Sequence, residues 1–408
     1  MSSDSLGLKN LANGNRLHGM DALRAIAMLL GIVLHSIIPY RIIVQNNWPS
    51  DSSFHSFYFD VAYVWIHTFR MPLFFLVAGF FARFLYFKIG ENRFLLHRAK
   101  RILLPFIVSL ITIVPLSIFP FIYYFDNIIQ DLNLSLIDLF KKSFFEWNGL
   151  IHLWFLYYLI IFYIITITFQ RIKIHLPKSL ISKATSLLSS FRFSKLINII
   201  IIGMVLSLFS FLYKDIVIEV YTGLRINLEM FVGYGFFYFI GWILHMQSHE
   251  LEFISKHTWT CLVAGSLLLI PILMTSKGNT DNTYFYVIIK LLAGVQVVLM
   301  VFGCLGFFMK YFNSENKRIR YISDSSYWFY LVHMCFIVSL QIGLMNSIVP
   351  GPLRWLVSLL ITTLISMISY DVFVRYSIIG NILNGPRKRK QRPEFKRDRL
   401  LPNLGTGK

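Results

Sequence analysis

Charged residues are scarce in this chain of 408 residues: they make up only 14% of it, against about 25% in soluble globular proteins. Hydrophobic residues make up 56% and aromatic residues 17%, led by 39 Phe, and the mean hydropathy is +0.61. So little charge excludes a soluble enzyme and a disordered protein, since both need more polar surface.

Cysteine is also rare, and the common catalytic motifs are missing. Cys261, Cys304 and Cys335 lie far apart inside apolar stretches. Three such thiols cannot form a disulfide framework and lack metal-ligand spacing, so we expect small hydrophobic side chains and no metal. No Gly-rich phosphate loop, His-Glu-x-x-His metal motif or Gly-x-Ser-x-Gly nucleophile motif occurs.

Long apolar runs take the place of these features. Crossing about 30 Å of hydrocarbon requires roughly 20 apolar residues in a helix. Residues 1–20 are polar and the first apolar run is too long for a cleavable leader, so we expect it to remain as an anchor. We predict an all-α integral membrane protein with ten transmembrane helices, at 23–43, 61–82, 102–122, 150–170, 196–213, 229–246, 259–275, 284–308, 327–346 and 353–374. These form one membrane domain over 23–375, with tails at 1–22 and 376–408.

The distribution of Lys and Arg predicts the orientation, because cytoplasmic loops collect these residues. The residues before the first span and after the last (1–22 and 375–408), with the loops 83–101, 171–195, 247–258 and 309–321, hold 29 of the 39, whereas the five opposite loops hold 6. Both termini are therefore predicted to be cytoplasmic. The basic tail, from Arg387 to Arg399, also resembles a nucleic-acid signal. After so many spans we expect it to lie against anionic lipid head groups instead, and we expect no nucleic-acid partner.

Ionisable residues inside spans are costly and are functional candidates by default. Arg24 and His35 lie eleven residues apart in the first span. In a helix this places them on one face, about 20° apart around the axis and about 16 Å apart along it. His67 and Arg70 share a face of the second span, at a depth similar to that of His35. This predicts a polar cluster of His35, His67 and Arg70 in the outer half of the membrane. The alternative is that these groups only hydrogen-bond to fix helix packing.

Two further sets of residues have both a functional and a structural interpretation. Arg98 and Arg101 lie one turn apart at the start of the third span, where guanidinium groups suit a phosphorylated ligand or act only as positive-inside anchors. The second set is His152, Trp154 and His333, within the fourth and ninth spans. For this set the structural alternatives are an aromatic-belt position for Trp154 and a packed, hydrogen-bonded ring for His333.

Other charged residues lie close to predicted outer ends of spans. Asp60, Lys290, Arg354 and Glu229 are of this kind. We expect their side chains to reach water there.

Five segments together resemble the acyltransferase-3 membrane family. RLHGMDALRAIAMLLGIVLH resembles its first span, HTFRMPLFFLVAGFF its second, and RAKR the Arg-x-x-Arg that precedes its third. IHLWFLYYL and FYLVHM are similar to the glucan succinyltransferase branch, glucans biosynthesis protein C. The resemblance covers nearly all of residues 16–375. Two departures are Ala78, where the family usually has Ser, and Met334-Cys335, where the branch tends to have His-Pro after the His.

The resemblance implies a catalytic His35 with an essential Arg24, and Arg98 and Arg101 near a coenzyme A donor. It also implies a bacterial inner-membrane enzyme that moves a succinyl or acetyl group from cytosolic acyl-CoA to a periplasmic glucan. His35 would be the general base, and His67 or Arg70 would stabilise the oxyanion. Direct transfer and an acyl-His35 intermediate both remain open.

Two other classes of protein fit the same layout of spans. One is a secondary transporter or flippase of a glycan or lipid-linked sugar, although we find no paired repeat with broken helices. The other is a non-catalytic scaffold for a polysaccharide-synthesising machine. Consumption of acyl-CoA by the purified protein would separate the enzyme from both.

Overall fold

The regular structure of this chain is helical. The computed structural model describes residues 17–147, 149–190, 192–193, 195–211, 220–275 and 283–385. Within these ranges the only strand-like pairing is an isolated bridge between Gly149 and Gly223. The basic tail from Arg387 to Arg399, which we predicted to lie against lipid, falls outside the described residues.

The helices follow the apolar runs of the sequence. Their bounds are α2 (His18–Ile37), α3 (Phe57–Ile89), α4 (Glu91–Arg98), α5 (Leu104–Ile122), α6 (Leu136–Phe145), α7 (Trp154–His175), α8 (Lys178–Ser190), α9 (Leu196–Ser210), α10 (Leu228–Met246), α11 (Leu251–Lys256), α12 (Thr258–Thr275), α13 (Thr283–Tyr311), α14 (Lys317–Leu344), α15 (Gly351–Ser369) and α16 (Ile378–Asn384).

Fewer of these helices qualify as full spans than the ten predicted. Within the described residues, eight helices are long and apolar enough to cross a membrane. A ninth is counted if Ser248–Lys256 and Thr258–Met274, bent by 68° at their junction, form one broken span. The run at 196–213 contains a shorter apolar helix, Leu196–Phe209. A multi-pass helical protein is thus confirmed, and the count of ten remains a prediction.

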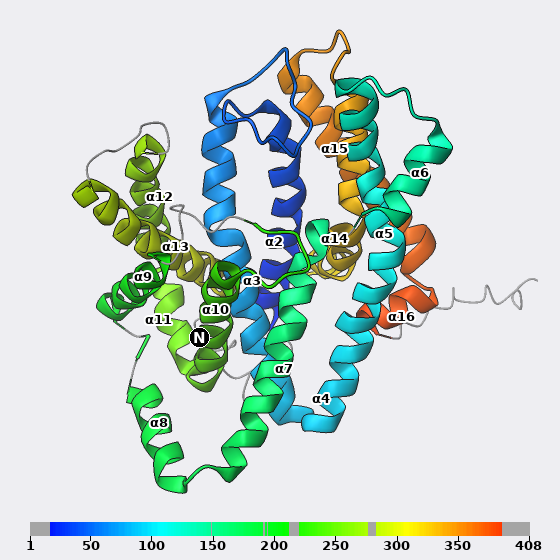
Figure 1. The fold of residues 1–408 in the computed structure, drawn as a ribbon. Coiled ribbons are helices and arrows are strands. Elements are labelled where there is room, and N and C mark those ends of the chain that lie inside the picture. The colour runs from blue at the N-terminus through cyan, green and yellow to red at the C-terminus, as the bar shows by residue number, and fades with distance from the viewer. Residues whose placement is uncertain are drawn as a thin grey trace, which may run out of the picture.

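Helix α2 lies in the middle of the bundle, where it packs against α3, α13 and α14 (Figure 1). α3 runs along α10, while α13 packs on α9 and α12, and α14 on α5 and α15. The crossing of α3 and α10 is close enough to require glycine. A Cβ at Gly79 would collide with the carbonyl oxygen of Tyr238, and one at Gly241 with that of Leu76. Small residues at such crossings are what brings membrane helices together.

The connections divide between the two ends of the bundle. In Figure 1, α4 and α8 lie at the lower end. The α2–α3 loop, α6 and the start of α15 lie at the upper end. The loops predicted to be basic and those predicted to be poor in charge therefore gather at opposite ends.

Candidate active site

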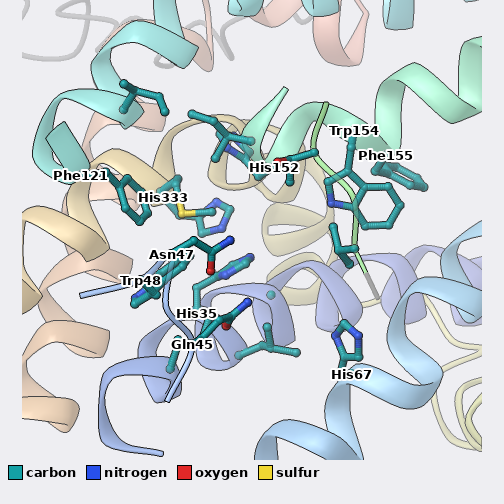
Figure 2. Close-up of a pocket in the computed structure, with 18 of the residues that line it drawn as sticks. His35, Gln45, Asn47, Trp48, His67, Phe121, His152, Trp154, Phe155 and His333 are labelled. Atoms are coloured by element: carbon teal, nitrogen blue, oxygen red, sulfur yellow. The ribbon is translucent and has the colours of Figure 1, made fainter. Parts of the chain in front are cut away.

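A cavity of about 500 Å³ opens among α2, α3, α5, α7 and α14. We call it the His35 cavity. It brings together all six candidates of the outer half of the membrane, namely His35, His67, Arg70, His152, Trp154 and His333. Figure 2 shows the rings of His35, His152 and His333 converging from different elements, with His67 on the opposite wall.

His35 lies on the last turn of α2, between two other rings. Its imidazole stacks on the indole of Trp48, with ring centroids 5.4 Å apart and ring planes 8° apart. On its other side the ring of His333 lies 5.4 Å away. The Nδ1 atom of His35 is buried and has no hydrogen-bond partner in the described structure. The folded chain thus leaves one polar atom of this imidazole unsatisfied, while other atoms of the His35 ring line the cavity.

Backbone carbonyls fix the other two imidazoles. Nε2 of His152 donates to the carbonyl of Leu331 at 3.0 Å, and Nδ1 of His333 donates to the carbonyl of Phe329 at 2.9 Å. Because a carbonyl only accepts, these nitrogens carry the protons. The opposite nitrogens, Nδ1 of His152 and Nε2 of His333, are buried without a hydrogen-bond partner within the described residues.

The guanidinium of Arg70 lies against the backbone of α2 one turn before His35. A Cβ at Gly31 would collide with the Nη1 atom of Arg70, so a larger residue there would displace the guanidinium. The Nε atom of Arg70 is buried without a partner among the described residues. Asp126 is the only acidic residue among those that line the cavity, and its carboxylate is bound by Lys142 at 2.6 Å. The guanidinium of Arg70 therefore has no counter-ion among the residues that line the cavity.

Trp154 and His67 line the cavity through stacked aromatic pairs. Trp154 is only 6% exposed and stacks on Tyr234 with centroids 5.3 Å apart. It is a buried wall residue, so the aromatic-belt alternative is wrong for it. His67 stacks on Tyr63, with centroids 5.3 Å apart and planes 9° apart.

The buried side-chain amide of Gln341 connects the loop of residues 41–56 to helices α2 and α14. Gln341 of α14 accepts a hydrogen bond from Nε1 of Trp48 at 3.2 Å and donates to the carbonyl of His35 at 2.9 Å. Gln341 thereby fixes the indole against which the imidazole of His35 stacks.

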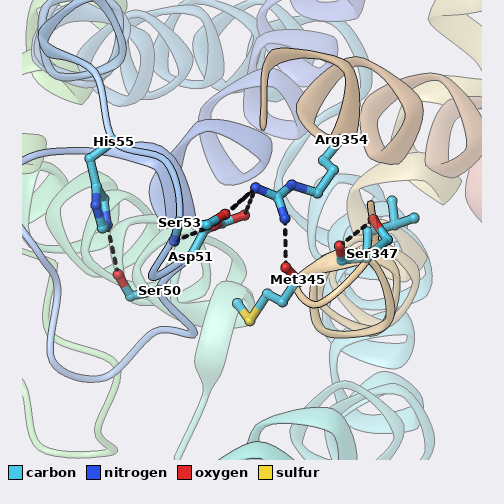
Figure 3. A network of polar contacts seen from close by, with 8 residues as sticks. Ser50, Asp51, Ser53, His55, Met345, Ser347 and Arg354 are labelled. Atoms are coloured by element: carbon cyan, nitrogen blue, oxygen red, sulfur yellow. Dashed lines mark hydrogen bonds and ion pairs between the residues drawn. The ribbon is translucent and has the colours of Figure 1, made fainter. Parts of the chain in front are cut away.

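Buried ion pairs hold the rest of this loop, residues 41–56, in place. Arg354 pairs with Asp51 at 3.2 Å and also donates to Ser53 and to the carbonyl of Met345, as Figure 3 shows. Arg41 pairs with Asp60 at 3.1 Å.

The expectation that the charged groups at the outer ends reach water is wrong for three of the four, whereas Glu229 is partly exposed. Asp60, Lys290 and Arg354 are 2%, 2% and 4% exposed. Protein partners replace water for Asp60 and Arg354, and the ammonium of Lys290 lies over the ring of Tyr286.

A second cavity of about 430 Å³ lies toward the other end of the bundle. We call it the Arg24 pocket. It is lined by the cations of Arg24, Lys88 and Arg101, by the carboxylates of Asp21 and Asp324, and by other residues of α14 and α16. Arg24 is half-exposed and lies 3.8 Å from Asp21. Arg24 and His35 therefore line different cavities, as their separation along one helix predicts.

Arg98 and Arg101 point in different directions. Arg101 belongs to a π-helical turn, Ala99–Leu103, a type of turn that is frequent at functional sites. Its side chain lines the Arg24 pocket. The guanidinium of Arg98 lies 4.8 Å from the ring centroid of Tyr163 and donates to the carbonyl of Phe81 at 3.4 Å. Only one member of the predicted pair faces the pocket.

No group of three or more His, Cys, Asp or Glu side chains in the described residues has the arrangement of a metal site. The imidazoles of the His35 cavity can transfer protons, and the guanidinium groups of the two cavities can bind anions.

The profile of the acyltransferase-3 family, described as an acyltransferase domain, matches residues 17–371. The chain belongs to the acyltransferase-3 family. It is similar to glucans biosynthesis protein C of Escherichia coli strain SMS-3-5, with 24% identity over 383 residues, which are 92% of this chain and 96% of that protein. The protein of the same name from strain K12 is 23% identical over the same shares. No solved structure matches the chain.

Two residues that line the His35 cavity, Trp48 and Gly31, and one that contacts its wall, Gln341, were not predicted from the sequence. Trp48 lies in a loop, where nothing in the sequence predicts a stacked histidine. Gly31 resembles any small residue of a span. Gln341 did carry a signal, because a Gln within a predicted span is a buried polar group that needs a partner.

Proposed function

We propose that this protein is a membrane O-acyltransferase. It transfers an acyl group, succinyl or acetyl, from cytosolic acyl-CoA to a sugar hydroxyl of an extracytoplasmic glycan. The observation that carries the proposal is the His35 cavity, in which a buried imidazole with an unpartnered nitrogen lies beside an arginine that lacks a carboxylate. Membership of an acyltransferase family supports the reaction class. The name of the relatives supports a glucan as the acceptor.

The reaction balances with His35 as the proton carrier. The imidazole of His35 accepts the proton of the sugar hydroxyl, whose oxygen attacks the thioester carbonyl carbon. A carbon–oxygen bond forms, the carbon–sulfur bond breaks, and the thiolate of coenzyme A leaves with the proton returned by His35. Base catalysis of this kind contributes about 10²–10⁴ to the rate.

Arg70 stabilises the negative charge on the carbonyl oxygen of the tetrahedral intermediate. A cation at this depth is expensive unless an anion meets it, and the cavity's own carboxylate is already paired with Lys142. The interaction is then strongest when the oxyanion develops, which is what accelerates a reaction. His152 and His333, held by backbone carbonyls, orient the reacting groups. His67 and Trp154 line the acceptor side.

The donor binds by its phosphates in the Arg24 pocket. Arg24, Lys88 and Arg101 supply three cations there, and guanidinium groups are suited to phosphate oxygens. Arg98 does not line the Arg24 pocket, and we propose that it supports the wall of this pocket.

The proposed orientation of the chain in the membrane follows the distribution of Lys and Arg in its loops. Residues 23–375 form the membrane domain with ten spans in a bacterial inner membrane, and the tails at 1–22 and 376–408 are cytoplasmic. The Arg24 pocket then faces the cytosol and the His35 cavity lies toward the periplasm. Reporter fusions at residue 408 and within the 41–56 loop test this. Periplasmic activity of the fusion at residue 408 would overturn it.

The function is tested by mass spectrometry of extracytoplasmic glycans from cells with the wild-type protein, with His35→Ala, and without the protein. His55→Ala is the matched control, because His55 is exposed and hydrogen-bonds only to Ser50 in the described structure. We expect an acyl mass increment with the wild type and with His55→Ala alone, and that mass identifies the acyl group. Unacylated glycan in every strain would refute the proposal. Disappearance of the glycan without the protein would favour a transporter.

A further inference from the structure

The two cavities approach each other within one turn of two helices. On α2, Arg24 lines the Arg24 pocket and Met28, four residues later, lines the His35 cavity. On α14, Tyr327 lines the Arg24 pocket and Tyr330, three residues later, lines the His35 cavity. One helical turn advances about 5 Å. The wall between the cavities is therefore about one side chain thick.

Two tyrosine rings form this wall on the side of α14. The rings of Tyr327 and Tyr330 lie nearly parallel, with centroids 6.4 Å apart and planes 27° apart. Their hydroxyls are held in opposite directions. Tyr327 donates to the carbonyl of Arg101 at 3.1 Å, and Tyr330 donates to the carbonyl of His152 at 2.7 Å. Each tyrosine is thus hydrogen-bonded to a residue of the cavity that it borders.

The proposed function requires a ligand to cross this wall. Arg24 and His35 are eleven residues apart on α2, or about 16 Å along the helix axis. A donor held by its phosphates at Arg24 can present a thioester to His35 only if a long, narrow arm joins the two groups. Coenzyme A has such an arm, and its shortest route runs between α2 and α14.

We propose that Tyr327, Tyr330 and Met28 form the passage for the thioester arm, and that its width determines which donors react. The inference rests on the proposed function. The hydroxyl of Tyr327 is hydrogen-bonded to the backbone carbonyl of Arg101, which belongs to the π-helical turn. Binding of phosphate at Arg101 and displacement of the ring of Tyr327 therefore both act on this turn. The passage is then closed by the two rings when no donor is bound.

The test narrows the passage from either wall and measures two quantities separately. Tyr327→Trp and Met28→Trp add bulk on α14 and α2. Tyr321→Trp is the matched control on α14, because Tyr321 is half-buried with its hydroxyl on Asp371, and it lines neither cavity. Each purified variant is compared with wild type for CoA affinity by calorimetry, for acyl transfer from acyl-CoA to glucan, and for thermal unfolding.

We expect both narrowed variants to transfer acyl groups at least tenfold more slowly, and Met28→Trp, which does not line the Arg24 pocket, to bind CoA within about threefold of wild type. Tyr321→Trp keeps both properties. Unchanged transfer in the two narrowed variants would overturn the passage, and so would a parallel loss of CoA binding and transfer in Met28→Trp. Absence of CoA binding and transfer in the wild type would instead be a failure of the proposed function.

Discussion

The buried ion pair between Arg354 and Asp51 should dominate the stability of the 41–56 loop. Arg354→Met removes a guanidinium that is 5% exposed and leaves a carboxylate that is 1% exposed. Loss of one partner of such a pair costs about 3–5 kcal/mol, since the other charge stays buried. Asp51 retains hydrogen bonds from the amide and hydroxyl of Ser53, at 2.9 and 2.8 Å. We therefore expect the lower end, about 3 kcal/mol.

The measurement is the free energy of unfolding in mixed detergent micelles, for Arg354→Met, Asp51→Asn and the double variant. The control pair is Lys256 and Glu252, whose nitrogen and oxygen lie 2.8 Å apart but whose side chains are 60% and 41% exposed. An exposed pair of this kind is worth about 0.2–1 kcal/mol. If Arg354→Met costs no more than Lys256→Met, the reasoning from burial is refuted.

Three further predictions concern the catalytic rate, each measured as acyl transfer to glucan. Gly31→Ala should slow transfer at least tenfold because its Cβ collides with Arg70, whereas Gly343→Ala, which meets nothing within 4 Å, should not; equal rates would contradict this placement of the guanidinium. Arg70→Gln should lower kcat by about 10²–10³, the usual loss for one oxyanion donor, and a change confined to KM would exclude that role. Gln341→Leu should lower kcat by about tenfold, because it frees the indole of Trp48, and Gln341→Glu should restore part of the loss; a Leu variant as active as wild type would remove Gln341 from the site.

Much of this architecture could be predicted from local sequence, because each of the long spanning helices is an apolar run. The run at 259–275 shows where this fails. Composition predicts an ordinary span there, but a bend of 68° before Thr258 makes it half of a broken pair. Such a bend depends on neighbours distant in the sequence.

The candidate site was predictable where helical period alone placed residues together. Arg24 and His35 were correctly assigned to one helix at different depths. Trp48 and Arg98 could not be placed in this way. The contact of Trp48 with His35 depends on a loop held by ion pairs, and the direction of Arg98 depends on a π-helical turn that periodicity does not predict.

The thin wall of tyrosine rings between the two cavities has an electrical consequence. A membrane enzyme with water on both faces must not discharge the ion gradients of the cell, and here the low-dielectric barrier narrows to about one side chain. The rings that admit a substrate arm must therefore also act as insulation against protons. A variant that shortens both rings should uncouple the membrane, and cells should tolerate it less well than a variant that merely inactivates the enzyme.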